Sequence, residues 1–113
     1  MGVGTGGTIA GVARKIKSKS PNTLVVGADP MGSILAIPAE LNKPAGPNKV
    51  EGIGYDFIPR TCCRECVDYW VKTEDPESFL TARELVRNEG LLVGGSSGAV
   101  MHAAMQFIKD KGW

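Results

Sequence analysis

Four apolar residues in the first twenty positions have the spacing of one helix face. They are Ile9, Val12, Ala13 and Ile16, at i, i+3, i+4 and i+7. The helix is expected to begin near Thr8 and to end at the turn residues 20–22. Residues 23–28 form a short β-rich run and predict a strand, which Asp29-Pro30 ends. We therefore expect a loop, a helix, a turn and a strand, and we expect the strand that should precede the loop to be missing.

The middle of the chain has a weaker pattern. Residues 31–60 are rich in proline and predict a loop with a short helix around 33–42. A glycine-punctuated turn is expected at 50–55, and residues 66–71 have the composition of a strand. So long a connection indicates a functional loop, or one that docks against other structure.

A clear helix is predicted to start at Asp75-Pro76, with Asp75 as the N-cap and Pro76 in the first helical position. Gly90 has the place of the residue that ends this helix. The residues expected to form its buried stripe are Phe79, Ala82, Leu85 and Val86.

Residues 91–93 predict a short buried strand, and residues 94–98 a turn into a last helix. Met101 and Met105 widen the apolar face of that helix, so we expect other structure to cover it on two sides. The face itself comprises Val100, Ala103, Ala104, Phe107 and Ile108. Helices and strands that alternate with short connections predict an α/β fold with a mostly parallel sheet.

Composition narrows the range of functions. The 113 residues are enough for one domain, with 42% hydrophobic and 22% charged residues. The net charge of +1 gives no field that would attract nucleic acid or an anionic membrane. Three cysteines, Cys62, Cys63 and Cys66, are an odd number crowded into five positions. A disulfide framework is therefore unexpected, a metal site would need further ligands, and solvent-edge thiols in a reducing cytoplasm are the favoured interpretation.

The glycine loop at the start of the chain predicts a phosphate site. Glycines let backbone N–H groups converge, and the following helix presents its positive N-terminus. Gly2, Gly4 and Gly7 match the dinucleotide fingerprint, and Asp29 follows Gly7 by 22 residues, where a ribose-binding acid belongs. The hydroxyls of neighbouring threonines instead suit one terminal phosphate. On the loop alone, a dinucleotide and a monophosphate cofactor both remain open.

The turn at 94–98 also matches G-x-S-x-G, the setting of a hydrolase nucleophile. The one histidine, His102, follows Ser96 by six residues in the same predicted helix and cannot reach back to it. The hydrolase interpretation therefore fails within this chain. Ser97 is expected to cap the helix, which leaves the Ser96 hydroxyl free to point into a cleft.

Three stretches together resemble the pyridoxal-phosphate enzymes of the cysteine synthase and cystathionine β-synthase family, in this order and spacing. They are GTGGT at 4–8, EGIGYDFIP at 51–59 and EGLLVGGSSG at 89–98. Asp29-Pro30, GSILA at 32–36, Tyr55-Asp56 and the doubled glycine before Ser96 are similar to the cystathionine β-synthase branch. The resemblance extends over nearly the whole chain.

The resemblance implies a three-layer αβα architecture with a parallel sheet, part of the large domain of a fold-type-II pyridoxal-phosphate enzyme (tryptophan synthase β-like). It also implies that Ser96 lies against the pyridine nitrogen of pyridoxal 5'-phosphate, and that Gly52 and Tyr55 lie on the substrate side. The residues implied to bind the cofactor phosphate are Gly4, Thr5, Gly6, Gly7 and Thr8.

The implied reaction is a β-replacement in which L-serine and L-homocysteine give L-cystathionine and water, as in transsulfuration and cysteine biosynthesis. An O-acetylserine sulfhydrylase (cysteine synthase), a fragment of a nicotinamide-dinucleotide-binding oxidoreductase and a cofactor-free interaction module are the alternatives. The implied full-length protein is a cytoplasmic lyase and a homo-oligomer, with no metal, nucleic-acid or membrane partner.

Two parts of the family's site have no match in this sequence. The segment with the Schiff-base lysine and the asparagine loop that contacts the cofactor are both absent, so none of the lysines here is nominated for that role. We therefore expect residues 1–113 to be a partial pyridoxal-phosphate-binding catalytic domain, its C-terminal portion, truncated at both ends. Alone, it is expected neither to fold stably nor to catalyse.

Overall fold

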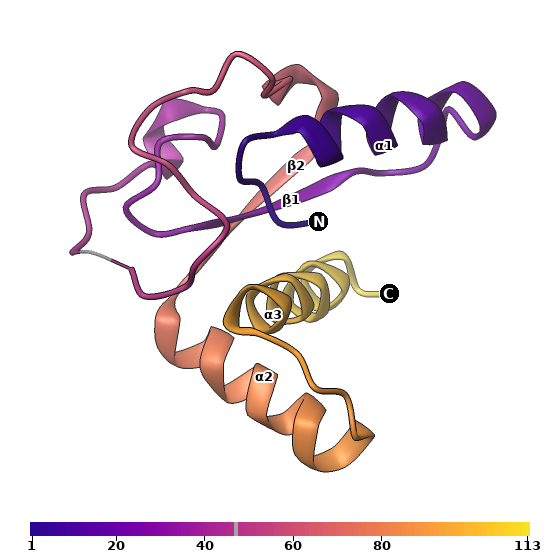
Figure 1. Ribbon diagram of the computed structural model, residues 1–113. Helices are drawn as coiled ribbons and strands as arrows, with labels where there is room; N and C mark the ends of the chain where they lie inside the picture. The colour runs from indigo at the N-terminus through magenta and orange to yellow at the C-terminus, as the bar shows by residue number, and fades with distance from the viewer. Residues whose placement is uncertain (47) are drawn as a thin grey trace.

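Helices lie on both sides of a small parallel sheet in the computed structural model, which describes residues 1–46 and 48–113 (Figure 1). Helix α1 lies on one side of the strands and α3 on the other, and α2 packs against α3. The elements are α1 (Gly7–Lys19), β1 (Val26–Pro30), the 3₁₀ turns η1 (Ala39–Leu41) and η2 (Arg64–Cys66), β2 (Tyr69–Thr73), α2 (Asp75–Glu89) and α3 (Gly95–Lys111). The α/β class, the parallel sheet and the αβα layering are thus confirmed.

Strands β1 and β2 run in parallel, from the pair Val26–Tyr69 to the pair Pro30–Thr73. Both begin about three residues later than the sequence predicts. The preceding residues are held by another contact, because the Asp68 carboxylate accepts the N–H of Val25 at 2.7 Å. The same carboxylate binds Lys17 Nζ of α1 at 2.6 Å, and this hydrogen bond lowers the pKa of Asp68.

The strand expected to be missing is present in part. Met1 O accepts the N–H of Ala28 at 2.8 Å, and the N–H of Val3 donates to Ala28 O at 3.0 Å. Gly2 therefore forms a parallel bridge with Ala28, on the side of β1 away from β2. Because successive residues of an extended segment face opposite sides, Val3 joins the core under α1 while Gly2 faces α3.

The core lies between α1 and the sheet. Ile9 and Ala13 of α1 are buried there, as their spacing predicts, whereas Val12 is 37% exposed and Ala10 takes its place. The buried face is thus rotated slightly from the predicted one. The apolar residues of this core cluster are Val3, Ile9, Ala13, Val25, Leu35 and Val67.

The predicted helix over 33–42 is wrong, because only the 3₁₀ turn Ala39–Leu41 forms there. Backbone N–H groups that a helix would use are bound by side chains instead. The N–H of Leu35 donates to Ser33 Oγ at 3.3 Å, and the N–H of Ala36 donates to Asp29 Oδ2 at 3.3 Å. Pro38 has no N–H to offer.

Helix α2 ends as predicted at Gly90, which has a φ of 69°. Its start differs, since Glu74 is the N-cap and Asp75 is already helical. The Asp75 carboxylate accepts the N–H of Lys49 at 2.7 Å, so it fastens a loop to the helix and is not the cap.

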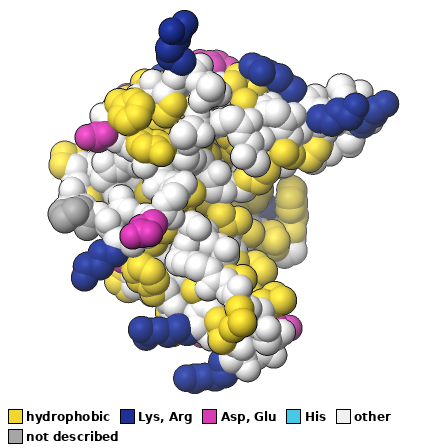
Figure 2. Space-filling model, in the orientation of Figure 1, with side chains coloured by type: hydrophobic (Ala, Val, Ile, Leu, Met, Phe, Trp, Pro, Cys, Tyr) yellow, Lys and Arg dark blue, Asp and Glu magenta, His cyan; other side chains and the backbone are white. Residues whose placement is uncertain are grey.

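Residues 91–93 do not form the predicted strand. Leu91 is 52% and Leu92 is 90% exposed, and no strand in the described part of the chain lies beside them to supply hydrogen bonds. Helix α3 contacts α2 and also the sheet, so it is covered on two sides as predicted. The part of its surface that carries Met101 and Met105 is not covered, because these side chains are 40% and 49% exposed. Figure 2 shows hydrophobic side chains gathered over the α2–α3 part of this surface.

Cys63 and Cys66 form a disulfide, which contradicts the prediction of solvent-edge thiols. The turn η2 brings their Cα atoms to 5.4 Å, inside the range that a disulfide spans. Cys62 remains as the free thiol. Three cysteines are compatible with one local disulfide, which leaves the third cysteine unpaired.

Candidate functional site

The glycine loop lies between the extended residues 1–3 and the N-terminus of α1. Gly6 is the N-cap, with a φ of 83°, a left-handed conformation that favours glycine. Ala10 is the first residue whose N–H bonds back, to Gly6 O at 3.0 Å, so the N–H groups of the first turn have no helical acceptor. Within the described residues this end has no side-chain cap and no acidic residue in its first turn. It is therefore open to an anion.

A second segment supports this loop from behind. Thr61 Oγ1 donates to Thr5 O at 2.6 Å. A Cβ on Gly6 would lie 2.6 Å from Cys62 Cβ and 2.8 Å from its sulfur, so Gly6 is required by this close approach. Burial raises the pKa of the Cys62 thiol, which keeps it neutral near pH 7. The sequence does not predict that Thr61 and Cys62 support the loop, because they lie more than fifty residues after it and no local pattern links the two segments.

The stretch that contains Gly52 and Tyr55 lies directly beside the glycine loop. The N–H of Gly54 donates to Val3 O at 2.8 Å, and a Cβ on Gly4 would lie 2.6 Å from Gly52 O. The half-buried Tyr55 packs its ring 5.1 Å from that of Phe57. The first two stretches of the resemblance are thus brought together.

Ser96 is the second residue of α3 and is half-buried. The turn before it packs closely on α2, since a Cβ on Gly95 would lie 2.6 Å from the Phe79 ring. The expectation that Ser97 caps α3 is wrong. Gly94 is the N-cap, and its carbonyl oxygen accepts the N–H groups of Ser97 and Gly98 at 3.1 and 3.2 Å.

A hollow of about 450 Å³ lies between the third stretch, at Ser96, and the second stretch, at Ile53. Val100 of α3 approaches Gly2 closely, at 3.3 Å from the position of a Cβ there. Ser96 is four residues before Val100 and therefore shares its helix face. Thr5, Thr8 and Tyr55 do not line this hollow. Its lining residues include Gly2, Ile53, Ser96, Ser97 and Val100.

Asp29 does not have the geometry of a ribose-binding acid. It is fully buried, and its Oδ2 lies 2.7 Å from Lys72 Nζ, whose side chain is 11% exposed. This buried ion pair overturns the dinucleotide interpretation of the loop. His102 is half-buried in α3, and the described residues contain no group of three or more His, Cys, Asp or Glu side chains that could hold a metal ion.

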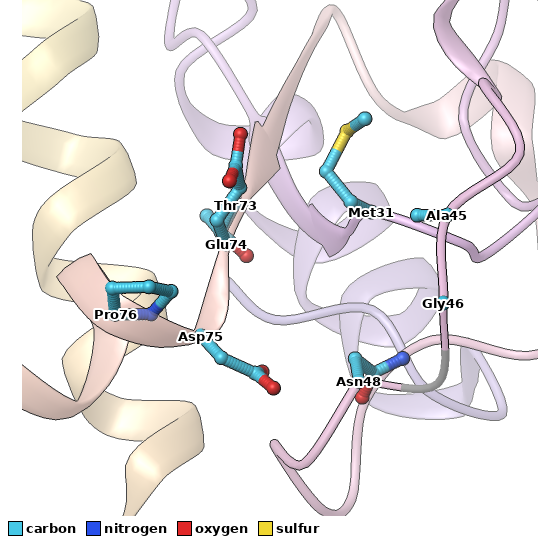
Figure 3. Close-up of a pocket in the computed structure, with 8 residues that line it drawn as sticks. All are labelled: Met31, Ala45, Gly46, Asn48, Thr73, Glu74, Asp75 and Pro76. Carbon is cyan, nitrogen blue, oxygen red and sulfur yellow. The ribbon is translucent and has the colours of Figure 1, made fainter.

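A smaller hollow of about 220 Å³ lies where β1 and β2 end (Figure 3). Thr73, Glu74 and Asp75 form one wall, and the Asp75 side chain points toward Asn48 in the facing loop. Because Asp75 already holds the backbone of this loop, the hollow is the seam where the loop docks. None of the residues expected to bind cofactor or substrate lies in it.

Comparisons with known proteins identify the same family that the three converging stretches resemble. Residues 1–112 match the family described as pyridoxal-phosphate dependent enzyme. The chain is 60% identical over 107 residues to a cystathionine beta-synthase of Dictyostelium discoideum, covering 95% of this chain and 22% of that protein. It is 51% identical over 110 residues to a cystathionine beta-synthase of Saccharomyces cerevisiae, covering 96% of this chain and 22% of that protein.

A solved structure supports the same relationship. The O-acetylserine dependent cystathionine beta-synthase of Helicobacter pylori superposes with a TM-score of 0.84 at 39% identity, covering 96% of this chain and 34% of that one. The chain thus spans about a fifth of the length of the curated relatives described above. The resemblance found in the sequence is confirmed. The chain belongs to the family of pyridoxal-phosphate dependent enzymes.

Proposed function

We propose that the protein, at its full natural length, catalyses the β-replacement that joins L-serine and L-homocysteine into L-cystathionine and water. The C–O bond to the serine hydroxyl breaks and a C–S bond to the homocysteine sulfur forms, while the thiol proton leaves with the hydroxyl as water. The observation that carries the proposal is the convergence of three family-like stretches on one region, in a chain 51–60% identical to proteins named cystathionine beta-synthase.

The glycine loop fits the phosphate of pyridoxal phosphate. A dianion is stabilised by the free N–H groups and the positive end of a helix, and α1 offers both without a competing carboxylate in its first turn. Thr5 and Thr8 are exposed and have hydroxyl donors. We therefore assign the phosphate to residues 4–8, namely Gly4, Thr5, Gly6, Gly7 and Thr8.

Ser96 is proposed as the partner of the pyridine nitrogen. A neutral hydroxyl does not hold the ring nitrogen protonated as a carboxylate would, so this pairing favours loss or exchange of a β-substituent over transamination. When bound, the cofactor supplies the electron sink that this chemistry needs. Gly52 and Tyr55 are proposed to face the amino-acid substrate, because their segment lies against the glycine loop.

The assay measures cystathionine formed from serine and homocysteine by the full-length protein. Activity that requires O-acetylserine in place of serine would favour the alternative leaving group, which the name of the Helicobacter pylori structure describes for that protein. Cysteine formed from O-acetylserine and sulfide would favour a cysteine synthase. A protein that binds pyridoxal phosphate but turns over none of these amino acids contradicts the proposal.

The proposal includes a cytoplasmic, homo-oligomeric enzyme. None of the helices in the described residues has the length and apolar character to span a membrane. A reducing cytoplasm opens accessible disulfides, so thiol trapping in intact cells should label all three cysteines. Labelling of Cys62 alone would contradict this location. The oligomeric state is tested by light scattering.

A further inference from the structure

We propose that Ser33 is a positioning residue for substrate binding, because its buried hydroxyl holds the backbone of Tyr55. The inference rests on the proposed function, which places Tyr55 on the substrate side. Ser33 is 2% exposed and lies in the loop after β1. Its Oγ accepts the N–H of Tyr55 at 3.1 Å and the N–H of Leu35 at 3.3 Å.

The Tyr55 backbone is held at both of its polar groups. Its N–H donates to Ser33, and its carbonyl oxygen accepts the N–H of Ile34 at 2.9 Å. The preceding Gly54 donates its N–H to Val3 O at 2.8 Å, at the entrance to the glycine loop. Gly54 and Tyr55 are thus hydrogen-bonded to the Ser33 turn on one side and to Val3, next to the glycine loop, on the other. The Tyr55 side chain itself remains half-exposed.

The contact between the two segments leaves little room for adjustment. Gly54 has a φ of 79°, and a Cβ there would lie 2.9 Å from Pro30 Cδ and 3.2 Å from Ser33 Cβ. The segment therefore lies directly on the Ser33 turn. A small change at Ser33 is transmitted to Tyr55, since nothing compressible separates them.

The Ser33 turn is in turn fixed to the sheet by the buried ion pair. Lys72 Nζ donates to Ser33 O at 3.0 Å while it binds Asp29 Oδ2 at 2.7 Å. The amide oxygen of Asn42 also lies 3.4 Å from this nitrogen. Strand β1 supplies the carboxylate of Asp29 and β2 the ammonium group of Lys72, so the turn that holds Tyr55 is fixed by the sheet.

The test replaces Ser33 with alanine in the full-length protein loaded with pyridoxal phosphate. Ser78→Ala is the matched control, because Ser78 is also fully buried and its Oγ donates to a carbonyl oxygen, that of Glu74, at 2.6 Å. Each variant loses one buried hydroxyl. Ser33→Ala should raise the KM and the dissociation constant for serine about two- to tenfold, whereas Ser78→Ala should leave both unchanged.

A second readout is independent of turnover. Hydrogen–deuterium exchange of a peptide spanning residues 52–57 should be faster in Ser33→Ala and unchanged in Ser78→Ala. Ser33→Cys keeps a weaker acceptor in the same place and should be intermediate in both measurements. It also supplies the measurement if Ser33→Ala does not fold.

Two results separate the possible failures. If the wild type binds serine, and Ser33→Ala matches the control in both serine affinity and exchange, the positioning role is wrong and the proposed function stands. If the wild type neither binds nor converts serine, the proposed function fails and the positioning role fails with it.

Discussion

Gly98 lies where α3 crosses α2, and replacing it with alanine tests this helix packing. A Cβ at residue 98 would overlap the carbonyl oxygen of Ser78 and would lie 2.8 Å from the backbone nitrogen of Ala82. Both are backbone atoms of α2, so no side-chain rotation relieves the contact. The two helices would have to move apart.

The expected cost follows from two opposing terms. Overpacking costs about 1–3 kcal/mol, and contact with fixed backbone places Gly98→Ala near the upper end of that range. The higher helix propensity of alanine relative to glycine offsets about 1 kcal/mol of this cost. The free energy of unfolding should therefore fall by about 2 kcal/mol, the difference between these terms.

Gly11→Ala is the matched control, because Gly11 is exposed in α1 and a Cβ there meets nothing within 4 Å. This change should stabilise the protein by about 0.5–1 kcal/mol. Urea unfolding of the full-length protein, followed by circular dichroism, gives both values from the shift in midpoint at a constant slope. The close crossing of α2 and α3 is refuted if the two variants are equally stable. Ser96, the residue proposed to bind the pyridine nitrogen, lies in the same first turn of α3 as Gly98, so weaker cofactor binding should accompany the loss of stability.

Three other predictions concern charges and the disulfide. Asp68→Asn should lower stability at neutral pH. The folded-state pKa of this carboxyl lies below 3.8, so its contribution is complete above that value, and the difference from wild type should vanish as the pH falls through the folded pKa in an acid titration of unfolding. Lys72→Met should lower the free energy of urea unfolding by about 3–5 kcal/mol, since it leaves the buried charge of Asp29 unpaired; a loss under 1 kcal/mol would contradict this. Reduction of the Cys63–Cys66 bond should lower the free energy of unfolding by about 2 kcal/mol, because the bond closes a short loop. Unfolding of the Cys63→Ser variant should not respond to dithiothreitol.

Several features were predictable because they depend on neighbours in the sequence. The spacing of Ile9 and Ala13 determined the buried face of α1 to within one residue. Gly90 ends α2 where its left-handed conformation is needed. The glycine loop was predictable as a helix start with free N–H groups, since these follow from local geometry alone.

Other features were decided by parts of the chain that are distant in the sequence. Asp29 had the right spacing for a ribose ligand, and only the pairing of β1 with β2 placed Lys72 against it. The absence of the helix predicted over 33–42 has a more local cause. The N–H groups of Leu35 and Ala36 donate to side chains two and seven residues earlier in the chain, in place of helical carbonyl oxygens.

The sequence by itself determined the family to which the chain belongs and where most of its helices start and stop. Only the tertiary structure decided that Gly4 meets Gly52, that Gly2 meets Val100, and that the turn at Ser33 carries Tyr55. The periodicity of hydrophobic residues and the positions of glycines predict local hydrogen bonding. The convergence of a site depends on which distant backbones pack in contact, and spacing along one chain does not specify that.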